Sequence, residues 1–301
     1  MRVFFVNKYT WLIWTLLMAL PSFSQQTTPR YKVAACDWMM LKRQKLGEFQ
    51  LAHQIGADGV EVDMGGLGNR TLFDNQLRRP EQAEKFKVAA IRYGIEVPSM
   101  AMSGFFAQSF IKRNNYKDLL NDCFQTMKVF GSKVAFLPLG GSGNTWHEDG
   151  ADRDTLIARL RVAGEMAKKE GVVIGIRTAM DARWNIRLLR AIGSKNIQIY
   201  YNLQDAADNH RDICKELKLL GRHRIIQIHA SNTDSVNLCE DPDIDLPKIK
   251  KTLDKMGWGG WLVVERSRDV RQVRNVKYNF GRNVAYLKEV FQGKKPMADN
   301  K

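Results

Sequence analysis

The sequence predicts a single domain of the α/β class, a (β/α)8 TIM barrel, and three observations lead to this prediction. Eight short runs rich in β-branched residues recur along the chain, their first residues are 25 to 39 positions apart, and each interval has room for one crossover helix. The runs cover residues 31–36, 59–63, 96–100, 133–138, 172–177, 197–201, 225–229 and 261–265. An open doubly wound sheet is the alternative arrangement of such repeats.

The intervals between the runs contain amphipathic helices that end at glycine. Pro80 begins a helix with helically spaced apolar residues, and Gly94 ends it. Residues 116–130 and 153–170 are expected to be helical on the same grounds, and a glycine and then a strand follow each of them. Because no low-complexity linker interrupts the repeats, we expect one domain.

The N-terminal segment is expected to lie outside that domain. The basic residues Arg2 and Lys8 precede an apolar run at 11–20, and small residues follow the run. This layout is typical of a secretory signal, and the run is too short to span a bilayer comfortably. We therefore expect a signal peptide over residues 1–24 and a secreted or periplasmic barrel over residues 25–301 with no stable membrane span. A retained anchor is the alternative.

The composition is that of an ordinary folded protein with an excess of basic residues. The chain has 47 Lys and Arg against 32 Asp and Glu, which gives a net charge of +15. Basic and acidic residues are interleaved along the predicted helices, so we expect mainly solvated helix faces, with an anionic partner as the alternative. No nucleic-acid-binding motif accompanies the charge, and the expected export argues against a nucleic-acid partner.

The four cysteines do not form a recognisable disulfide or metal motif. Cys36, Cys123, Cys214 and Cys239 are widely spaced and give no C-x-x-C pair. We expect buried free thiols. An oxidising compartment would also permit a bridge, and the sequence leaves its pairing open.

Polar residues stand where the predicted strands end, which is the edge at which barrels of this class carry their chemistry. Alternate residues of a strand share one face, so Glu61 lies on the same face as Asp63 and Gln227 on the same face as His229. The candidates at or just after the strand ends are Asp37, Trp38, Glu61, Asp63, Ser103, His147, Arg177, Asn202, His229 and Glu265.

Four strand-end sequences carry a family resemblance over essentially the whole of residues 25–301. They are GVEV at 59–62, EGVVIGIRT at 170–178, IHA at 228–230 and GWLVVERSR at 260–268, with DLP at 245–247 between the last two. They resemble the xylose isomerase-like barrel superfamily, which contains sugar isomerases and epimerases and endonuclease IV.

The resemblance implies a divalent Mn, Mg, Co or Zn ion held by Glu, Asp, His and Glu at the ends of the fifth to eighth strands. His229 and Glu265 match, whereas Asn202 stands in place of Asp and Arg177 in place of Glu. The formal charge of the set rises from −3 to zero, and Arg has no lone pair to offer. We therefore expect the metal site at His229, Glu265 and Asn202 to be weak or absent. We expect Arg177 to pair with Glu265 or to bind an anionic substrate group.

The resemblance also implies proton transfer through an enediolate between two opposed carboxylates. Only Glu265 of such a pair remains. Glu61, Asp63 and His147 are the candidates for the second group, and an ion pair with a neighbouring arginine is the alternative role for Glu61 and Asp63. For substrate binding the sequence offers the cations Arg177 and Arg266 for anionic groups and the aromatic rings of Trp38 and Trp146 for sugar stacking. Asp63 is a further candidate for substrate binding.

The predicted function is that of a carbohydrate-active isomerase or epimerase acting on a small sugar or keto-sugar, with a degenerate metal site. A lyase or hydrolase of oxidised glycosides is a related alternative, since β-elimination also passes through an enolate. The sequence is also compatible with a non-catalytic barrel that binds a sugar or uronate, and with a surface protein whose basic helices hold an anionic partner. A homo-oligomer is a further expectation from the resemblance.

Overall fold

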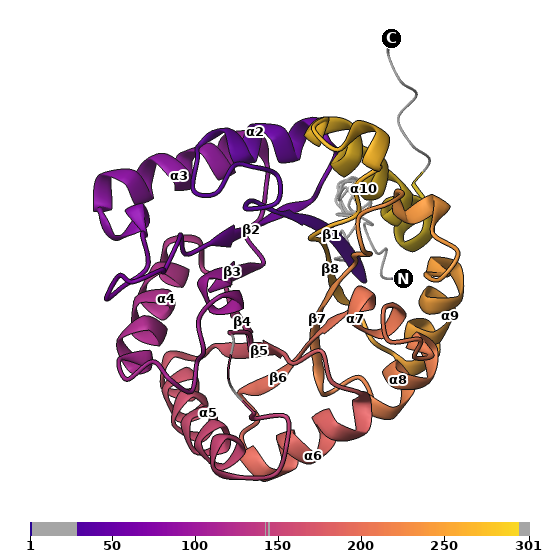
Figure 1. Cartoon of the computed structure of the whole chain (residues 1–301). Coiled ribbons are helices and arrows are strands. Elements are labelled where there is room, and N and C mark those ends of the chain that lie inside the picture. Colours follow the sequence, from indigo (N-terminus) through magenta and orange to yellow (C-terminus); the bar gives the residue numbers. More distant parts are fainter. Residues whose placement is uncertain (2–28, 142, 144, 295–301) are drawn as a thin grey trace.

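A computed structural model describes residues 1, 29–141, 143 and 145–294. Eight parallel strands close into a barrel in the order β1 to β8, with the helices around it (Figure 1). The strands are β1 (Tyr31–Cys36), β2 (Gly59–Asp63), β3 (Ser99–Ala101), β4 (Val134–Pro138), β5 (Val173–Arg177), β6 (Ile197–Asn202), β7 (Ile225–His229) and β8 (Gly260–Val264). The expected (β/α)8 barrel is confirmed. Apart from Met1, the expected signal peptide lies outside the described residues.

The helices follow the strands as the repeat requires. They are α2 (Gly47–Gln54), α3 (Pro80–Tyr93), α4 (Tyr116–Phe130), α5 (Ala151–Glu170), α6 (Ala182–Ile192), α7 (Leu203–Ala207), α8 (Ile213–Leu220), α9 (Leu246–Met256) and α10 (Val276–Gln292). Four short 3-10 helices lie in the described loops at Gln76–Arg78, Ser103–Phe106, Leu238–Glu240 and Val270–Gln272. Among the described residues, no helix has both the length and the hydropathy to cross a bilayer.

The third strand begins later than the sequence predicts. We expected it at 96–100, whereas β3 covers Ser99–Ala101. Pro98 lacks the N–H that a central strand donates, and Glu96 joins the sheet only through an isolated bridge to Gly59. The chain therefore enters the barrel only after the proline.

The connection after β6 contains a short helix that the sequence analysis did not predict. The side chain of Asn202 accepts a hydrogen bond from the backbone N–H of Gln204 and so caps α7. Asp205 follows in the first turn of that helix. The last residue of β6 thus holds an acidic side chain at the barrel mouth.

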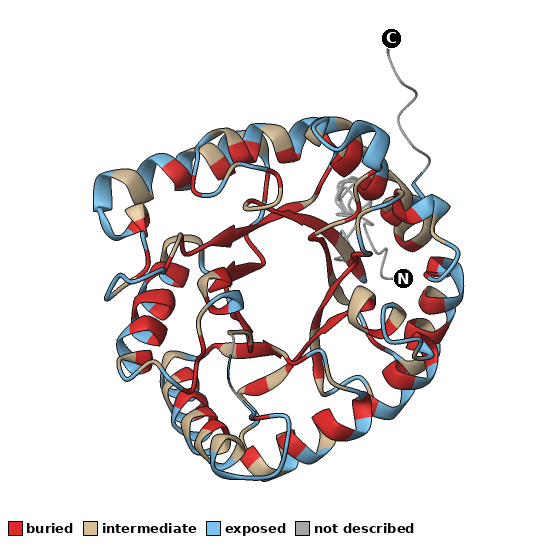
Figure 2. Ribbon diagram, in the orientation of Figure 1, coloured by how far each residue is buried: buried red, intermediate tan, exposed pale blue. Residues whose placement is uncertain are grey.

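The barrel has two buried layers. The larger one lies between the strands and the helices, and Figure 2 shows the buried sides of the helices turned toward the strands. The smaller one fills the barrel interior with Ala34, Cys36, Ala101, Val134, Phe136, Tyr200 and Val263. Cys36, Cys123 and Cys214 are buried free thiols as expected, whereas Cys239 is a free thiol that is exposed.

Candidate functional site

The ends of β5 to β8 bring four of the predicted residues together. One Arg177 nitrogen, Nη1, donates to both carboxylate oxygens of Glu265, at 2.9 and 3.3 Å. The Asn202 amide donates to Glu265 Oε2 at 3.0 Å, and His229 Nδ1 lies 3.6 Å from the same oxygen. Glu265, the first residue after β8, is therefore the centre of this cluster, which we call the mouth cluster.

Arg177 is held by a second carboxylate that the sequence analysis missed. Its Nε and Nη2 donate to the two oxygens of Asp205 at 2.8 and 2.7 Å. The expected pair with Glu265 is confirmed, but the two-pronged contact is made with Asp205. Burial opposes the charged form of Arg177, yet Glu265 and Asp205 outweigh burial and raise the pKa of the guanidinium. Arg177 is thus a fixed positive charge.

Glu265 is held as a carboxylate by its neighbours. Burial alone would raise its pKa, because the side chain is only 4% exposed. The charge of Arg177 and the hydrogen bond from Asn202 help to outweigh burial, and the pKa of Glu265 lies below its ordinary value.

A second network in the barrel interior orients His229. Glu61 Oε1 lies 2.8 Å from His229 Nε2, and Glu61 Oε2 accepts from Ser99 Oγ at 2.6 Å and from the Tyr200 hydroxyl at 2.8 Å. A carboxylate accepts hydrogen bonds only, so Nε2 carries a proton in this contact. His229 Nδ1 has no hydrogen-bond partner among the described residues and faces Glu265. Glu61 thereby fixes the ring, and Nδ1 is the nitrogen that is turned toward Glu265.

The mouth cluster does not fit the divalent ion that the fold family implies. Arg177 places a cation against Glu265, where a metal would need an anionic ligand. Asn202 directs its amide nitrogen at Glu265, because its oxygen is committed to the cap of α7. No group of three or more His, Cys, Asp or Glu side chains suited to a metal occurs among the described residues. The residues present favour the arginine over an ion.

Aromatic rings lie beside the mouth cluster. Trp38, just after β1, is stacked on Phe136 at 6.4 Å between ring centroids and lies edge-on to His229 at 6.3 Å. Phe106 lies with its ring centroid 5.4 Å from Arg177 Cζ and is 38% exposed. These two rings are the accessible apolar surfaces beside the charged residues.

Two predicted residues of the fourth strand end lie in a separate contact. Trp146 is buried against Trp184 at 5.6 Å between ring centroids. The His147 side chain is 45% exposed and lies 3.5 Å from Glu148, and its backbone carbonyl accepts a hydrogen bond from Trp184. Neither side chain contacts the mouth cluster, so both roles expected for them remain predictions without structural support.

Asp63 belongs to a buried acidic group beside the mouth. It forms an ion pair with Arg43 at 3.2 Å and accepts from the backbone N–H of Ser103 and Gly65. Burial raises its pKa to about 6 in spite of Arg43. The alternative expected for it, an ion pair with a neighbouring arginine, is confirmed. The same alternative is wrong for Glu61, whose carboxylate contacts His229 instead.

Asp37 and Glu48 complete this acidic group. Asp37 accepts a hydrogen bond from the backbone N–H of Gln44. Burial, and then the charge of Asp63, raise the pKa of Asp37 to about 8, and burial raises the pKa of Glu48 well above its ordinary value. Burial and the neighbouring carboxyl groups thus oppose the charged forms of Asp37 and Glu48.

Arg266 is also committed to an acidic neighbour. Asp234 accepts from Arg266 Nη2 at 3.0 Å and from Arg268 Nε at 3.0 Å. The Arg266 side chain is 39% exposed. Like Arg177, it is paired with an acidic side chain of the chain, which it shares with Arg268.

The sequence contains signals for Tyr200 and Asp205, the two site residues that the sequence analysis missed. Tyr200 lies two positions before Asn202, so strand alternation places it on the same inner face. Asp205 lies three positions after Asn202, a spacing typical of a cap followed by an acidic first turn. A search limited to the last residue of each strand finds neither Tyr200 nor Asp205.

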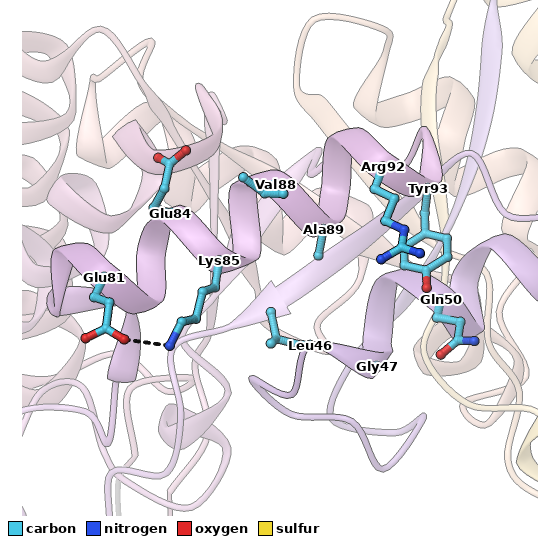
Figure 3. A pocket seen from close by; sticks show the side chains of 10 residues that line it. All are labelled: Leu46, Gly47, Gln50, Glu81, Glu84, Lys85, Val88, Ala89, Arg92 and Tyr93. Atoms are coloured by element: carbon cyan, nitrogen blue, oxygen red, sulfur yellow. Dashed lines mark hydrogen bonds and ion pairs between the residues drawn. The ribbon is translucent and has the colours of Figure 1, made fainter.

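Two cavities lie away from the mouth. A groove of about 670 Å³ runs between α2 and α3, where Glu81 pairs with Lys85 across one helix turn (Figure 3). A second cavity, of about 780 Å³, is lined by residues at the N-terminal ends of β4, β7 and β8.

The model of the xylose isomerase-like TIM barrel family matches residues 49–290, and the chain belongs to this family. The comparison with curated proteins gives no match. Three similar solved structures show the same fold. A D-psicose 3-epimerase from Clostridium cellulolyticum has a TM-score of 0.67 at 11% identity, over 86% of this chain and 99% of that one. A 3-keto-D-glucoside 4-epimerase from E. coli has a TM-score of 0.66 at 14% identity, over 86% and 99%. A sugar phosphate isomerase/epimerase from Parabacteroides distasonis has a TM-score of 0.65 at 14% identity, over 88% and 98%.

Proposed function

We propose that this chain acts on a neutral sugar or keto-sugar by isomerase- or epimerase-type proton transfer, with Arg177 supplying the positive charge at the mouth. The observation that carries the proposal is the contact of Arg177 with Glu265 at the strand ends. The similar structures include epimerases of ketoses and of a 3-keto-glucoside, which supports the sugar class.

His229 is the proton carrier in this proposal. Glu61 keeps a proton on Nε2, so Nδ1 is the atom that takes a proton from a carbon next to a carbonyl and delivers it to the neighbouring carbon of the enediolate, as in an aldose–ketose isomerisation. Epimerisation instead requires that the enediolate receives a proton on its opposite face. Arg177 donates to the carbonyl oxygen as negative charge develops on it, exchanging its contact with Glu265 for one with the substrate. Glu61 is a positioning residue, since Ser99, Tyr200 and His229 occupy its oxygens.

A neutral ligand suits the mouth better than a uronate. Arg177 and Arg266 both face acidic residues of the chain, so an added carboxylate would compete with Asp205, Glu265 and Asp234. Trp38 and Phe106 supply the apolar surface on which a sugar ring stacks.

Solvent exchange tests the proposal. Fructose, psicose, tagatose and a 3-keto-glucoside are incubated with the protein in D2O, with and without a chelator, and deuterium on carbon is followed by NMR. We expect incorporation that survives chelation and is lost in His229→Asn and much reduced in Arg177→Leu. The exposed variant Lys251→Ala is the control. Incorporation that appears only with added metal would contradict the proposal.

A second function has support from burial. His229 and Glu61 are fully buried, so a substrate reaches Nδ1 only if the side chains that cover it move. A barrel that binds a sugar without turning it over needs no such movement. Sugar binding by calorimetry with no deuterium exchange over the whole panel would assign this function instead.

Export remains part of the proposal. The basic start, the apolar run at 11–20 and the small residues after it support cleavage after residue 24. N-terminal sequencing of the protein from a fractionated cell tests this, and a mature chain that retains Arg2 in the cytoplasmic fraction would contradict it.

A further inference from the structure

The end of the barrel opposite the mouth holds a cavity that the proposed function does not use. Its volume is about 780 Å³, and its lining comes from the end of α3, the end of α4 and the starts of β4, β7 and β8. A volume of several hundred cubic ångströms is typical of small-molecule sites.

An unsatisfied buried group lies in its wall. Gln227 lines the cavity and is 2% exposed. Its amide nitrogen donates to the Pro98 carbonyl at 3.3 Å, while its Oε1 has no hydrogen-bond partner among the described residues. A buried acceptor without a donor is destabilising, so a hydroxyl group placed there would be stabilising.

The cavity also offers a flat apolar surface. The Trp261 ring lines it, with Lys32 Nζ at 5.3 Å from the ring centroid, and Gly59 leaves room for the ring: a Cβ there would lie 2.9 Å from Trp261 Cζ3. The C–H face of a sugar ring stacks on such a surface.

The charges at the rim favour an anion. Lys87 and Lys133 line the cavity, are exposed and form no ion pair among the described residues. The acidic residue of the lining, Glu96, is neutralised by Lys32 at 2.6 Å. Within the described part of the chain, Lys87 and Lys133 thus remain as unpaired cations in the lining that also contains Trp261 and Gln227.

We propose that this cavity binds a small hydroxylated anion, a monosaccharide that carries a carboxylate or a phosphate group. A hydroxyl donates to Gln227 Oε1, the ring lies on Trp261, and the anionic group lies between Lys87 and Lys133. This site is separate from the mouth, where the cations are already paired.

Calorimetry with four probes tests the proposal: glucuronate, glucose 6-phosphate, glucose and inorganic phosphate. We expect one or both sugar anions to bind at least about tenfold more tightly than glucose and than inorganic phosphate, a difference of roughly 1.4 kcal/mol. Whichever anion binds identifies the anionic group. Equal binding of inorganic phosphate, or binding of neither sugar anion, would overturn the proposal.

Variants locate the site. Lys87→Glu combined with Lys133→Glu changes only exposed side chains, and we expect it to weaken binding of the sugar anion at least about tenfold. Gln227→Leu should weaken it as well. The matched control is Lys117→Glu combined with Lys251→Glu, which makes the same charge change outside the cavity. Binding that survives the first pair, or that the control pair weakens equally, would overturn the assignment.

Discussion

Arg177 Nη1 lies 2.9 Å from Glu265 Oε2, so a guanidinium from β5 meets the carboxylate that follows β8. Both side chains are at most 15% exposed. Breaking a buried pair leaves an uncompensated charge and costs about 3–5 kcal/mol. We expect Arg177→Leu to lower the free energy of unfolding by this amount in urea denaturation.

The matched control for this variant is Arg266→Leu. Arg266 also pairs with an acidic residue, but it is 39% exposed, and surface pairs contribute about 0–1 kcal/mol. Equal losses of unfolding free energy in Arg177→Leu and Arg266→Leu would show that the Arg177–Glu265 pair does not behave as a buried pair.

Asp37 makes the stability of the fold depend on pH, with the opposite sign to that of an ordinary ion-paired carboxylate. Its pKa is about 8 in the folded protein and about 3.9 in an unfolded chain, so the folded state binds more protons between these values. Stability contributed by this proton is present below about pH 4 and is lost as the pH rises toward 8. The Asp37→Asn variant should therefore become more stable relative to the wild type as the pH rises. The free energy of unfolding of both proteins, measured from pH 4 to 8, tests this. A constant difference between the two proteins would contradict the raised pKa.

Phe106 is expected to contribute to sugar binding more than to folding. The ring is 38% exposed over Arg177, and an exposed cation–π contact contributes about 0.5–1 kcal/mol. We expect the free energy of unfolding of Phe106→Ala to lie within about 1 kcal/mol of that of the wild type. We expect the variant to bind sugar about tenfold more weakly. Val162→Ala, at a similarly exposed apolar side chain on α5, is the control and should leave binding unchanged.

The barrel could be predicted from the sequence because strands and helices alternate with local signals that do not depend on distant contacts. The one clear displacement, at β3, comes from Pro98, whose missing donor excludes the residues before it from the sheet. The boundary could have been placed after the proline from the sequence alone.

The site could be predicted only where a residue ends a strand. Arg177, Asn202, His229 and Glu265 meet because the ends of parallel strands lie at one edge. Asp205 reaches Arg177 through a five-residue helix, and the loop after β4 directs His147 elsewhere. Loop conformation depends on tertiary contacts, which strand and helix patterns do not specify.

Restoring the family's ligand set by Arg177→Glu with Asn202→Asp tests the role of Arg177. Two acidic residues would then join His229 and Glu265, and the nearest cation would be gone. At an effective dielectric near 20 each charge pair at about 4 Å contributes roughly 4 kcal/mol, so we expect Mn²⁺ affinity to rise at least about a hundredfold. Arg92→Glu with Asn121→Asp makes the same charge change at exposed helix positions and should leave the affinity near that of the wild type.

The most direct measurement is calorimetric titration of the wild-type protein with Mn²⁺, beside the restored variant. If Arg177 takes the place of an ion, the variant binds one Mn²⁺ and is stabilised by it against heat, while the wild type shows neither effect. A wild-type protein that binds one Mn²⁺ as tightly as the variant would contradict this account of the barrel mouth.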